Sequence, residues 1–226
     1  MWPLPKVSTE RICVSITPSD ATCAWIYVSQ KNQLELKSYT RIAWENSSRA
    51  LSHQLTDFVK RNKLHHSLLS VALSAPLIHE QFIRLSTASP QLQDLPTLQL
   101  RKLLWDYRYL HTLDDGQSLF YLCGIERSHI FSQQLLAHQS NLYLMNISSS
   151  YMALIQAYRA LFGFAFRRSQ LALDLIAHNY KLDEIISVEN MHRLVRIPSA
   201  LNINLDEEKL SLLTLIGLFN QERTIE

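Results

Sequence analysis

The stretch from Leu68 to Ala75, LLSVALSA, constrains the fold more than any other part of the sequence, because it is a nearly continuous apolar run of strand length. Such a run is typical of a strand that is buried on both faces of a sheet, as the strands of parallel sheets are. A helical pattern over about 48–62 precedes it, with one apolar stripe formed by Leu51, Leu55, Phe58 and Val59. A helix of this length supplies the crossover that a parallel strand requires.

Three segments of alternating apolar residues open the chain. Ile12, Val14 and Ile16 mark the first strand, and the tight connection TPSDA leads to the second, marked by Ala24, Ile26 and Val28. Residues 34–39 continue as a third strand, so an antiparallel meander is expected. Meander, helix and buried strand follow one another in this order in ribonuclease-H and actin-like folds. The sequence therefore predicts a mixed α/β fold with a ribonuclease-H/actin-like core.

After Pro76 the pattern changes to a second set of elements. The alternating segment Gln81–Ala88 predicts a strand, Pro96–Trp105 a helix, and Asp106–Leu113 with Ser118–Ile125 a hairpin. The turn Asp114-Asp115-Gly116 carries the Asp-Gly signal that is typical of a hairpin connection. A strand-helix-strand-strand module is thus expected as an insertion after the fourth strand of the core.

The rest of the chain predicts further core elements. Ser128 is expected to cap a helix, Asn141–Ile147 to form a strand, and Ser148 to Ser150 to cap a helix that ends near Phe162. Asn204 and Glu207 have capping-box spacing at the start of a helix over about 205–220, whereas the signals between Phe166 and Pro198 are short and mixed. We therefore divide the chain into a first core part (1–76), the inserted module (77–126), a second core part (127–163) and a reduced C-terminal lobe (164–226).

Composition excludes several kinds of function. The net charge of +2, without a long basic run, argues against nucleic acid as a partner. Cys13, Cys23 and Cys123 stand singly among apolar neighbours, as buried thiols of a reducing compartment do. The start of the chain has no signal-peptide core, and no run of 18 apolar residues occurs, so a cytosolic protein without direct membrane insertion is expected. The apolar stretch from Tyr151 contains Gln156 and Arg159 and favours a packed helix, with an interfacial membrane helix as the alternative.

No catalytic or metal site is expected. The cysteines lack ligand spacing, and His65-His66 has no converging carboxylates, which favours an exposed loop over a metal site. The opening strand RICVSIT carries no carboxylate, as a nuclease metal site would need, and no serine lies in a GxSxG elbow. An aromatic face that could stack bases or pack in the core is formed by Tyr107, Tyr109, Phe120 and Tyr121. Since few basic residues flank these aromatic residues, core packing is favoured.

From Leu68 to Gly163, the order of elements resembles that of PilM, the actin-like protein of type IV pilus and competence-pilus assembly. The segments that carry this resemblance are SVALSAP, QFIRLS, the WDYRY hairpin and the long stretch from YLCGIERSHIF to YRALFG. About two thirds of the chain takes part, and the specificity lies in the order of elements. The C-terminal SLLTLIGLFNQ is similar to the closing helix of the family.

Two departures from the family concern nucleotide binding. PilM-like ATPases carry an Asp-Ile-Gly type phosphate loop between the first two strands, where this chain has Thr17, Pro18, Ser19 and Asp20. Glycine is absent and Pro18 has no N–H to donate, so we expect a degenerate phosphate loop that acts as a plain hairpin turn. Only Gly217 remains as a glycine after Gly163, although the family needs further glycine-containing loops. No cofactor and no enzymatic activity are therefore expected.

The resemblance implies a non-enzymatic cytoplasmic scaffold, a pseudo-ATPase, in a pilus assembly platform at the inner membrane. Its expected partner is the N-terminal cytoplasmic tail of a PilN-type membrane protein, together with other pilus-assembly components, and these partners would hold it at the membrane periphery. In the family the tail lies between the core and the inserted module, which by position points to Ala75, Pro76, Phe82, Arg84, Trp105 and Tyr107. The alternatives are an active actin-like ATP-binding protein and a GspL-like cytoplasmic component of type II secretion.

Overall fold

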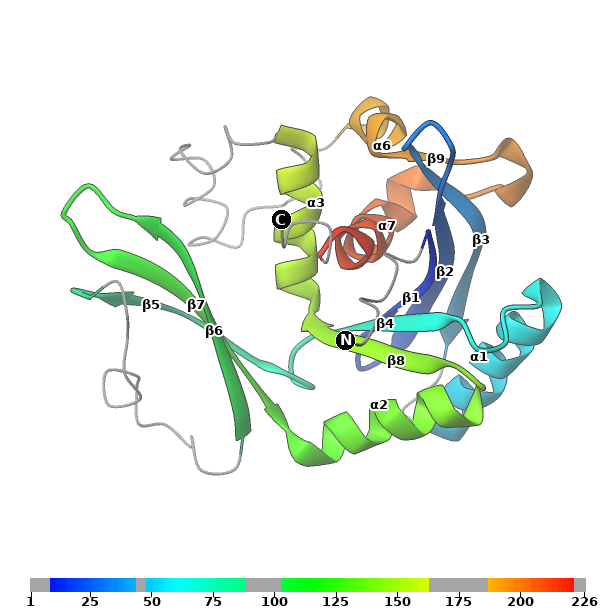
Figure 1. Cartoon of the computed structure of the whole chain (residues 1–226), viewed down its shortest axis with the longest axis horizontal. Coiled ribbons are helices and arrows are strands. Elements are labelled where there is room, and N and C mark those ends of the chain that lie inside the picture. Colours follow the sequence, from blue (N-terminus) through cyan, green and yellow to red (C-terminus); the bar gives the residue numbers. More distant parts are fainter. Residues whose placement is uncertain (1–8, 44–47, 88–102, 163–186, 222–226) are drawn as a thin grey trace, which may run out of the picture.

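The computed structural model describes residues 9–43, 48–87, 103–162 and 187–221, and the structural statements below concern these residues. They form a six-stranded sheet in the order β8-β4-β1-β2-β3-β9 and a three-stranded sheet in the order β5-β7-β6 (Figure 1). The large sheet consists of β1 (Glu10–Ile16), β2 (Asp20–Val28), β3 (Leu34–Ala43), β4 (Leu68–Leu73), β8 (Tyr143–Ser149) and β9 (Val195–Arg196). The small sheet consists of β5 (His79–Leu85), β6 (Leu103–Thr112) and β7 (Ser118–Glu126).

The large sheet confirms the predicted core. β1, β2 and β3 form an antiparallel meander, and β4 pairs in parallel with β1 on one side and with β8 on the other. The crossover between β3 and β4 is α1 (Ser48–Asn62), as the apolar stripe predicts. Val71 and Ala72 of β4 are fully buried, one toward each face, which explains the continuous apolar run.

Helices cover both faces of the large sheet. α1 and α2 (Arg127–Gln139) pack on one face, around Leu55, Phe58 and Val71. On the other face lie α3 (Ser150–Phe162), α6 (Val188–Leu194) and α7 (Leu205–Asn220). A short 3-10 turn, Ser199–Leu201, connects β9 to the segment before α7. The small sheet lies to one side of this core, and α3 stands between the two (Figure 1).

Several local predictions are confirmed. β6 and β7 form the predicted hairpin, with Gly116 in the left-handed region at φ +81° and its N–H donating to Leu113 O. Asn204 caps α7, because its side-chain oxygen accepts from the N–H of Asp206. Ser149 Oγ accepts from the N–H of Met152 at the start of α3, as one of the three predicted capping serines.

Other local predictions are wrong. The helix predicted to end at Trp105 lies mostly in residues outside the described part, but Leu103–Trp105 belong to β6, where pairing with β7 overrides the helical spacing. Ser128 does not cap α2: the N-cap residue is Glu126, and the Ser128 hydroxyl donates to its carboxylate. β8 begins two residues later than predicted, since Asn141 has φ +56° in a turn.

α7 and α3 approach each other so closely that one position admits only glycine. A Cβ built on Gly217 would lie 1.7 Å from the carbonyl oxygen of Ala153 and 2.5 Å from its carbonyl carbon. Both atoms belong to the backbone of α3 and cannot rotate away. Around this contact α7 is buried without interruption from Leu212 to Phe219.

We expect Gly217→Ala to lower the free energy of unfolding by about 2–3 kcal/mol or more, because overpacking against backbone has to be relieved by moving a helix. Helix propensity alone would predict that the same change raises the free energy of unfolding by about 1 kcal/mol. Urea unfolding followed by circular dichroism measures the difference. Ser211→Ala, in the half-buried part of the same helix, is the control, with a change within about 0.5 kcal/mol. A neutral or stabilising Gly217→Ala would contradict the close approach.

Candidate functional site

A groove of about 620 Å³ lies between the small sheet and the core, and we call it the tail groove. One wall is β6 from Leu104 to Arg108, with Tyr121, Cys123 and Ile125 of β7 behind it. The other wall is β8 from Asn146 to Ser149. It is completed by single residues of four further segments, namely Ile78 before β5, Ile130 of α2, Met152 of α3 and Gln221 after α7.

Two edge strands border the tail groove. β6 is the last strand of the small sheet and β8 the last strand of the large sheet, as far as the described residues go. An edge strand presents backbone N–H and C=O groups that can pair with an added strand. An extended peptide in the groove could therefore be held by main-chain hydrogen bonds as well as by side chains.

The side chains of β6 that face the core follow from its pairing with β7. Directly paired residues of an antiparallel ladder point to the same side of the sheet. Leu104 pairs with Ile125, Asp106 with Cys123 and Arg108 with Tyr121, and all three partners pack toward the core. Leu104, Asp106 and Arg108 therefore supply the groove face of β6, one apolar and two oppositely charged side chains.

Trp105 and Tyr107, which the resemblance suggested for the groove, are among its lining residues. Their side chains nevertheless lie on the other face of the small sheet. The Trp105 ring covers Gly124, where a Cβ would lie 2.9 Å from the ring, and Tyr107 contacts the ring of Phe120 at a centroid distance of 6.0 Å. Neither ring is therefore offered to a ligand in the groove, and the N–H of Tyr107 already donates to Asp106 Oδ1 at 2.8 Å.

The other four suggested residues do not line the groove. Ala75 and Pro76 are joined by a cis peptide bond in the exposed turn after β4. Phe82 packs its ring against Tyr121 and Tyr151, with centroid distances of 5.4 and 5.3 Å. Arg84 is exposed on β5, at the opposite edge of the small sheet from β6.

Tyr121 fastens the small sheet to the core at the floor of the tail groove. Its buried hydroxyl donates to the carboxylate of Glu80 on β5 and also contacts the hydroxyl of Ser149 on β8. Burial, and after it the neighbouring Glu80 carboxylate, raises the pKa of the Tyr121 phenol well above its ordinary value. The phenol therefore stays protonated at physiological pH, as its donation to Glu80 requires.

Polar groups also fix the end of α7 at the groove. Gln221 Nε2 donates to Ser148 Oγ at 2.6 Å, and Asn146 Nδ2 donates to Gln221 Oε1 at 3.3 Å. The other amide atom of Asn146, Oδ1, is buried and has no hydrogen-bond partner among the described residues. A buried acceptor without a donor carries a cost in free energy.

The turn between β1 and β2 satisfies its own polar groups. Thr17 N–H donates to Asp20 O at 2.8 Å, and the N–H groups of Ser19 and Asp20 both donate to Thr17 Oγ1, at 3.3 and 3.0 Å. Pro18 has no N–H. Every backbone donor from Thr17 to Asp20 is thus used inside the turn, and Ile16 pairs with Ala21 to close a plain hairpin, as predicted.

Asp20 ties this turn to the first turn of α7. Its carboxylate accepts from Thr17 Oγ1 at 2.7 Å and from Arg41 Nε at 2.8 Å. Arg41 also contacts Glu208 at 3.4 Å, and Glu208 accepts from the hydroxyl of Tyr39. Burial raises the pKa of Asp20, but the hydrogen bonds from Thr17 and Arg41 and the charge of Arg41 outweigh it, so that the pKa is lowered.

The described part of the chain holds neither a metal-binding cluster nor a membrane-spanning helix. Residues 9–43, 48–87, 103–162 and 187–221 hold no group of three or more His, Cys, Asp or Glu side chains placed to bind a metal ion. Within the same ranges, no helix has the length and apolar character needed to cross a membrane.

Comparison with known proteins relates the fold to solved structures. No protein family model and no curated protein matches the sequence. The chain is similar to a structure of the PilM-PilN type IV pilus biogenesis complex, with a TM-score of 0.50 and 13% identity over 67% of this chain and 50% of the other. It thus spans about half the length of that protein. The shared fold agrees with the predicted actin-like α/β architecture.

Two further solved structures are similar at lower scores. The cytoplasmic domain of EpsL, an inner membrane component of the type II secretion system of Vibrio cholerae, has a TM-score of 0.42 and 13% identity over 64% of this chain and 57% of the other. A Bacteroides thetaiotaomicron protein of unknown function with an actin-like ATPase fold has a TM-score of 0.42 and 11% identity over 95% and 99% of the two chains.

The Asp20 contacts predict a pH-dependent stability. Because the pKa of Asp20 is lowered on folding, its contribution is complete above the pKa of the unfolded chain, ordinarily about 3.9, and is lost as the pH falls through the lower folded pKa. We expect Asp20→Asn to cost less than about 1 kcal/mol at pH 7, and the difference from wild type to shrink below about pH 4. Urea unfolding at neutral and acidic pH measures both. Asp114→Asn, in the exposed hairpin turn between β6 and β7, is the control. An Asp20→Asn cost that is the same at both pH values would contradict the lowered pKa of Asp20.

Proposed function

We propose that this protein is a non-enzymatic scaffold of a PilM-like kind, which binds the N-terminal cytoplasmic tail of a PilN-type inner-membrane protein in the tail groove. The observation that carries this proposal is the position of two sheet edges, β6 and β8, on opposite walls of one groove. The similar solved structure is that of a complex between PilM and PilN. The protein would lie in the cytoplasm and reach the membrane through this partner.

The chemistry of the groove suits an extended peptide better than a compact ligand. Leu104 is 44% exposed and offers an apolar contact, while Asp106 and Arg108 can pair with charges of either sign two residues apart on a peptide strand. On the facing wall, the edge of β8 can pair with a peptide backbone. Main-chain pairing gives affinity in this mode, and the alternating side chains give specificity.

The hairpin turn at Thr17–Asp20 supports the non-enzymatic part of the proposal. In a phosphate loop, backbone N–H groups point at the phosphate oxygens. Here the three available N–H groups are held inside the turn, and the carboxylate of Asp20 is neutralised by Arg41. A bound phosphate would have to break these contacts and face the remaining negative charge of Glu208.

A synthetic peptide that corresponds to the N-terminal tail of the PilN-type protein of the same genome should bind the full chain with a Kd of about 1 µM or lower, roughly −8 kcal/mol. Leu104→Asp should weaken binding at least about tenfold, because it places a charge at the apolar contact of the groove. Fluorescence anisotropy of the labelled peptide measures both affinities.

Tyr109→Ala is the matched control for the peptide experiment. Tyr109 lies on the same edge strand and is 45% exposed, but its ring packs against Phe120 on the face away from the groove. We expect its peptide affinity to stay within about twofold of wild type. Absence of binding by the unmodified chain, or equal losses for both variants, would contradict the proposed site.

Mg-ATP tests the non-enzymatic part separately. A nucleotide present at about 100 times its Kd would stabilise the fold by about 2.7 kcal/mol, which corresponds to a rise in melting temperature of roughly 5–10 °C for a chain of this size. We expect no rise. A reproducible shift that requires both magnesium and the γ-phosphate would identify an ATP-binding protein instead.

A further inference from the structure

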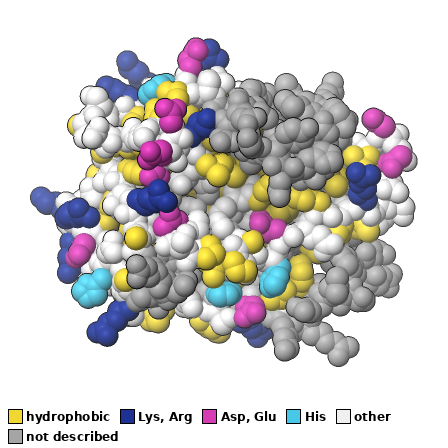
Figure 2. Space-filling model, turned by 180° about the vertical axis from the view of Figure 1, so that it is seen from behind, with side chains coloured by type: hydrophobic (Ala, Val, Ile, Leu, Met, Phe, Trp, Pro, Cys, Tyr) yellow, Lys and Arg dark blue, Asp and Glu magenta, His cyan; other side chains and the backbone are white. Residues whose placement is uncertain are grey.

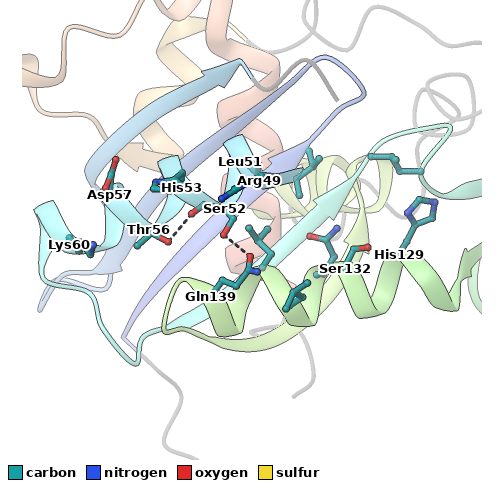
Figure 3. A pocket seen from close by; sticks show the side chains of 15 residues that line it. Arg49, Leu51, Ser52, His53, Thr56, Asp57, Lys60, His129, Ser132 and Gln139 are labelled. Carbon is teal, nitrogen blue, oxygen red and sulfur yellow. Dashed lines mark hydrogen bonds between the residues drawn. The ribbon is translucent and has the colours of Figure 1, made fainter. Parts of the chain in front are cut away.

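A second groove, of about 830 Å³, lies between α1 and α2 on the opposite side of α2 from the tail groove, and we call it the helix groove (Figure 3). Its floor is apolar and buried: Ile16, Leu51 and Leu136 are at most 6% exposed. The two helices are bridged near the C-terminal end of α2, where Ser52 Oγ donates to Gln139 Oε1 at 2.7 Å. The two grooves share no lining residue within the described part of the chain.

α2 carries two large apolar side chains that are exposed to solvent rather than packed in the core. Leu136 and Ala137 face the core, whereas Phe131 is 66% exposed and Leu135 is 56% exposed. Phe131 and Leu135 are four residues apart and thus share one side of the helix, and Leu135 lines the helix groove. An apolar floor with an exposed apolar ridge beside it marks a surface that a partner can bury.

Basic residues outnumber acidic ones at the helix groove, where Arg49 and Lys60 line it against Asp57. α1 carries Arg49, Lys60 and Arg61 against the single carboxylate of Asp57, and α2 carries Arg127 and no acidic residue. These two helices therefore hold a larger positive excess than the whole chain, whose net charge is only +2. Lys and Arg side chains gather at the left-hand edge of the view in Figure 2, on the side where α1 lies.

We propose that the helix groove docks an amphipathic α-helix of a partner protein, with apolar residues at helical spacing on one face and Asp or Glu on the flanks. The walls are helices, and the described lining residues offer no strand edge, so strand addition is not available here. A third helix laid along α1 and α2 would pack its apolar ridge onto the exposed Leu135 and the half-buried Leu77 by ordinary helix packing. Its acidic flanks would face Arg49 and Lys60, which line the groove.

The same residues could attract an anionic membrane or a second copy of the chain, but the geometry favours the acidic helix. A flat lipid surface would meet the exposed Phe131 and Leu135 but could not enter the space between α1 and α2, whereas the ridge of a helix can. A second copy would bring the same basic helices to the interface, and like charges across an interface oppose association. This proposal goes beyond the scaffold function and does not depend on the tail groove.

Phage display on the full chain tests the helix groove. The library consists of helical peptides of about 18 residues with fixed apolar positions at i, i+4 and i+7, and with Glu or Lys equally frequent on the flanks. We expect selected peptides to be rich in Glu, to bind with micromolar Kd, and to bind more weakly as salt is raised. Leu135→Glu and Lys60→Glu should each weaken binding at least about tenfold.

Gln134→Glu is the matched control, because Gln134 is exposed on α2, lies next to Leu135 and does not line the groove. It adds the same negative charge as Leu135→Glu and should change affinity less than about threefold. Circular dichroism of each variant establishes that the fold is retained. Leu104→Asp in the tail groove should leave helix binding unchanged, so this proposal and the scaffold proposal can fail independently.

Several results would overturn the proposal. These are failure to select any peptide, selection of Lys-rich peptides, and equal weakening by Gln134→Glu and Leu135→Glu. Binding of the chain to vesicles of anionic phospholipid that is lost in Leu135→Glu would assign the surface to the membrane instead. Dimerisation in analytical ultracentrifugation that is lost in the same variant would assign it to self-association.

Discussion

The contact between α7 and α3 at Gly217 is the constraint on which the rest of the structure depends. With the backbone of α7 against that of Ala153, α7 can lie across the large sheet, with Leu212–Phe219 fully buried beneath α3. Its first turn then reaches β3, where Glu208 meets Tyr39 and Arg41. Its last residues reach β8, where Gln221 binds Ser148 and closes one end of the tail groove. Gly217 thus sets how closely α7 approaches α3, and α7 carries the Glu208 contacts at its start and leads to Gln221 of the tail groove at its end.

The hairpin turn at Thr17–Asp20 uses its backbone N–H groups within the turn itself. A loop that binds phosphate needs free N–H groups and a charge balance that favours an anion. Here the hydroxyl of Thr17 accepts hydrogen bonds from two backbone N–H groups of the turn. The carboxylates of Asp20 and Glu208 both contact the guanidinium of Arg41. The turn therefore links β2 and β3 to α7. These contacts hold the turn against the first turn of α7.

Much of the fold could be predicted from the sequence, because its strongest signals are local. The meander, α1, the hairpin turn at Gly116 and the Asn204 cap depend on residues within one element or turn. The face of β6 could not be predicted, because Leu103–Trp105 have helical spacing and only pairing with β7 makes them a strand. Trp105 and Tyr107 were suggested by their position alone, and which face of β6 each side chain takes follows only from the pairing with β7. The pairing of Asp106 with Cys123 depends on residues 17 positions apart, which no local pattern encodes.

The two grooves differ in what they can recognise, and the difference comes from the elements that build them. The tail groove lies between two strand edges, so we expect it to bind the backbone of an extended peptide. The oppositely charged Asp106 and Arg108 would select among peptide sequences. The helix groove lies between two helices whose lining side chains include Arg49 and Lys60 against one carboxylate, Asp57, and the proposed partner is an apolar helical ridge with acidic flanks. α2 contributes Ile130 to the first groove and Leu135 to the second. A protein that holds two different segments on either side of one helix can bring two partners together without any chemistry of its own, which is what an assembly scaffold has to do.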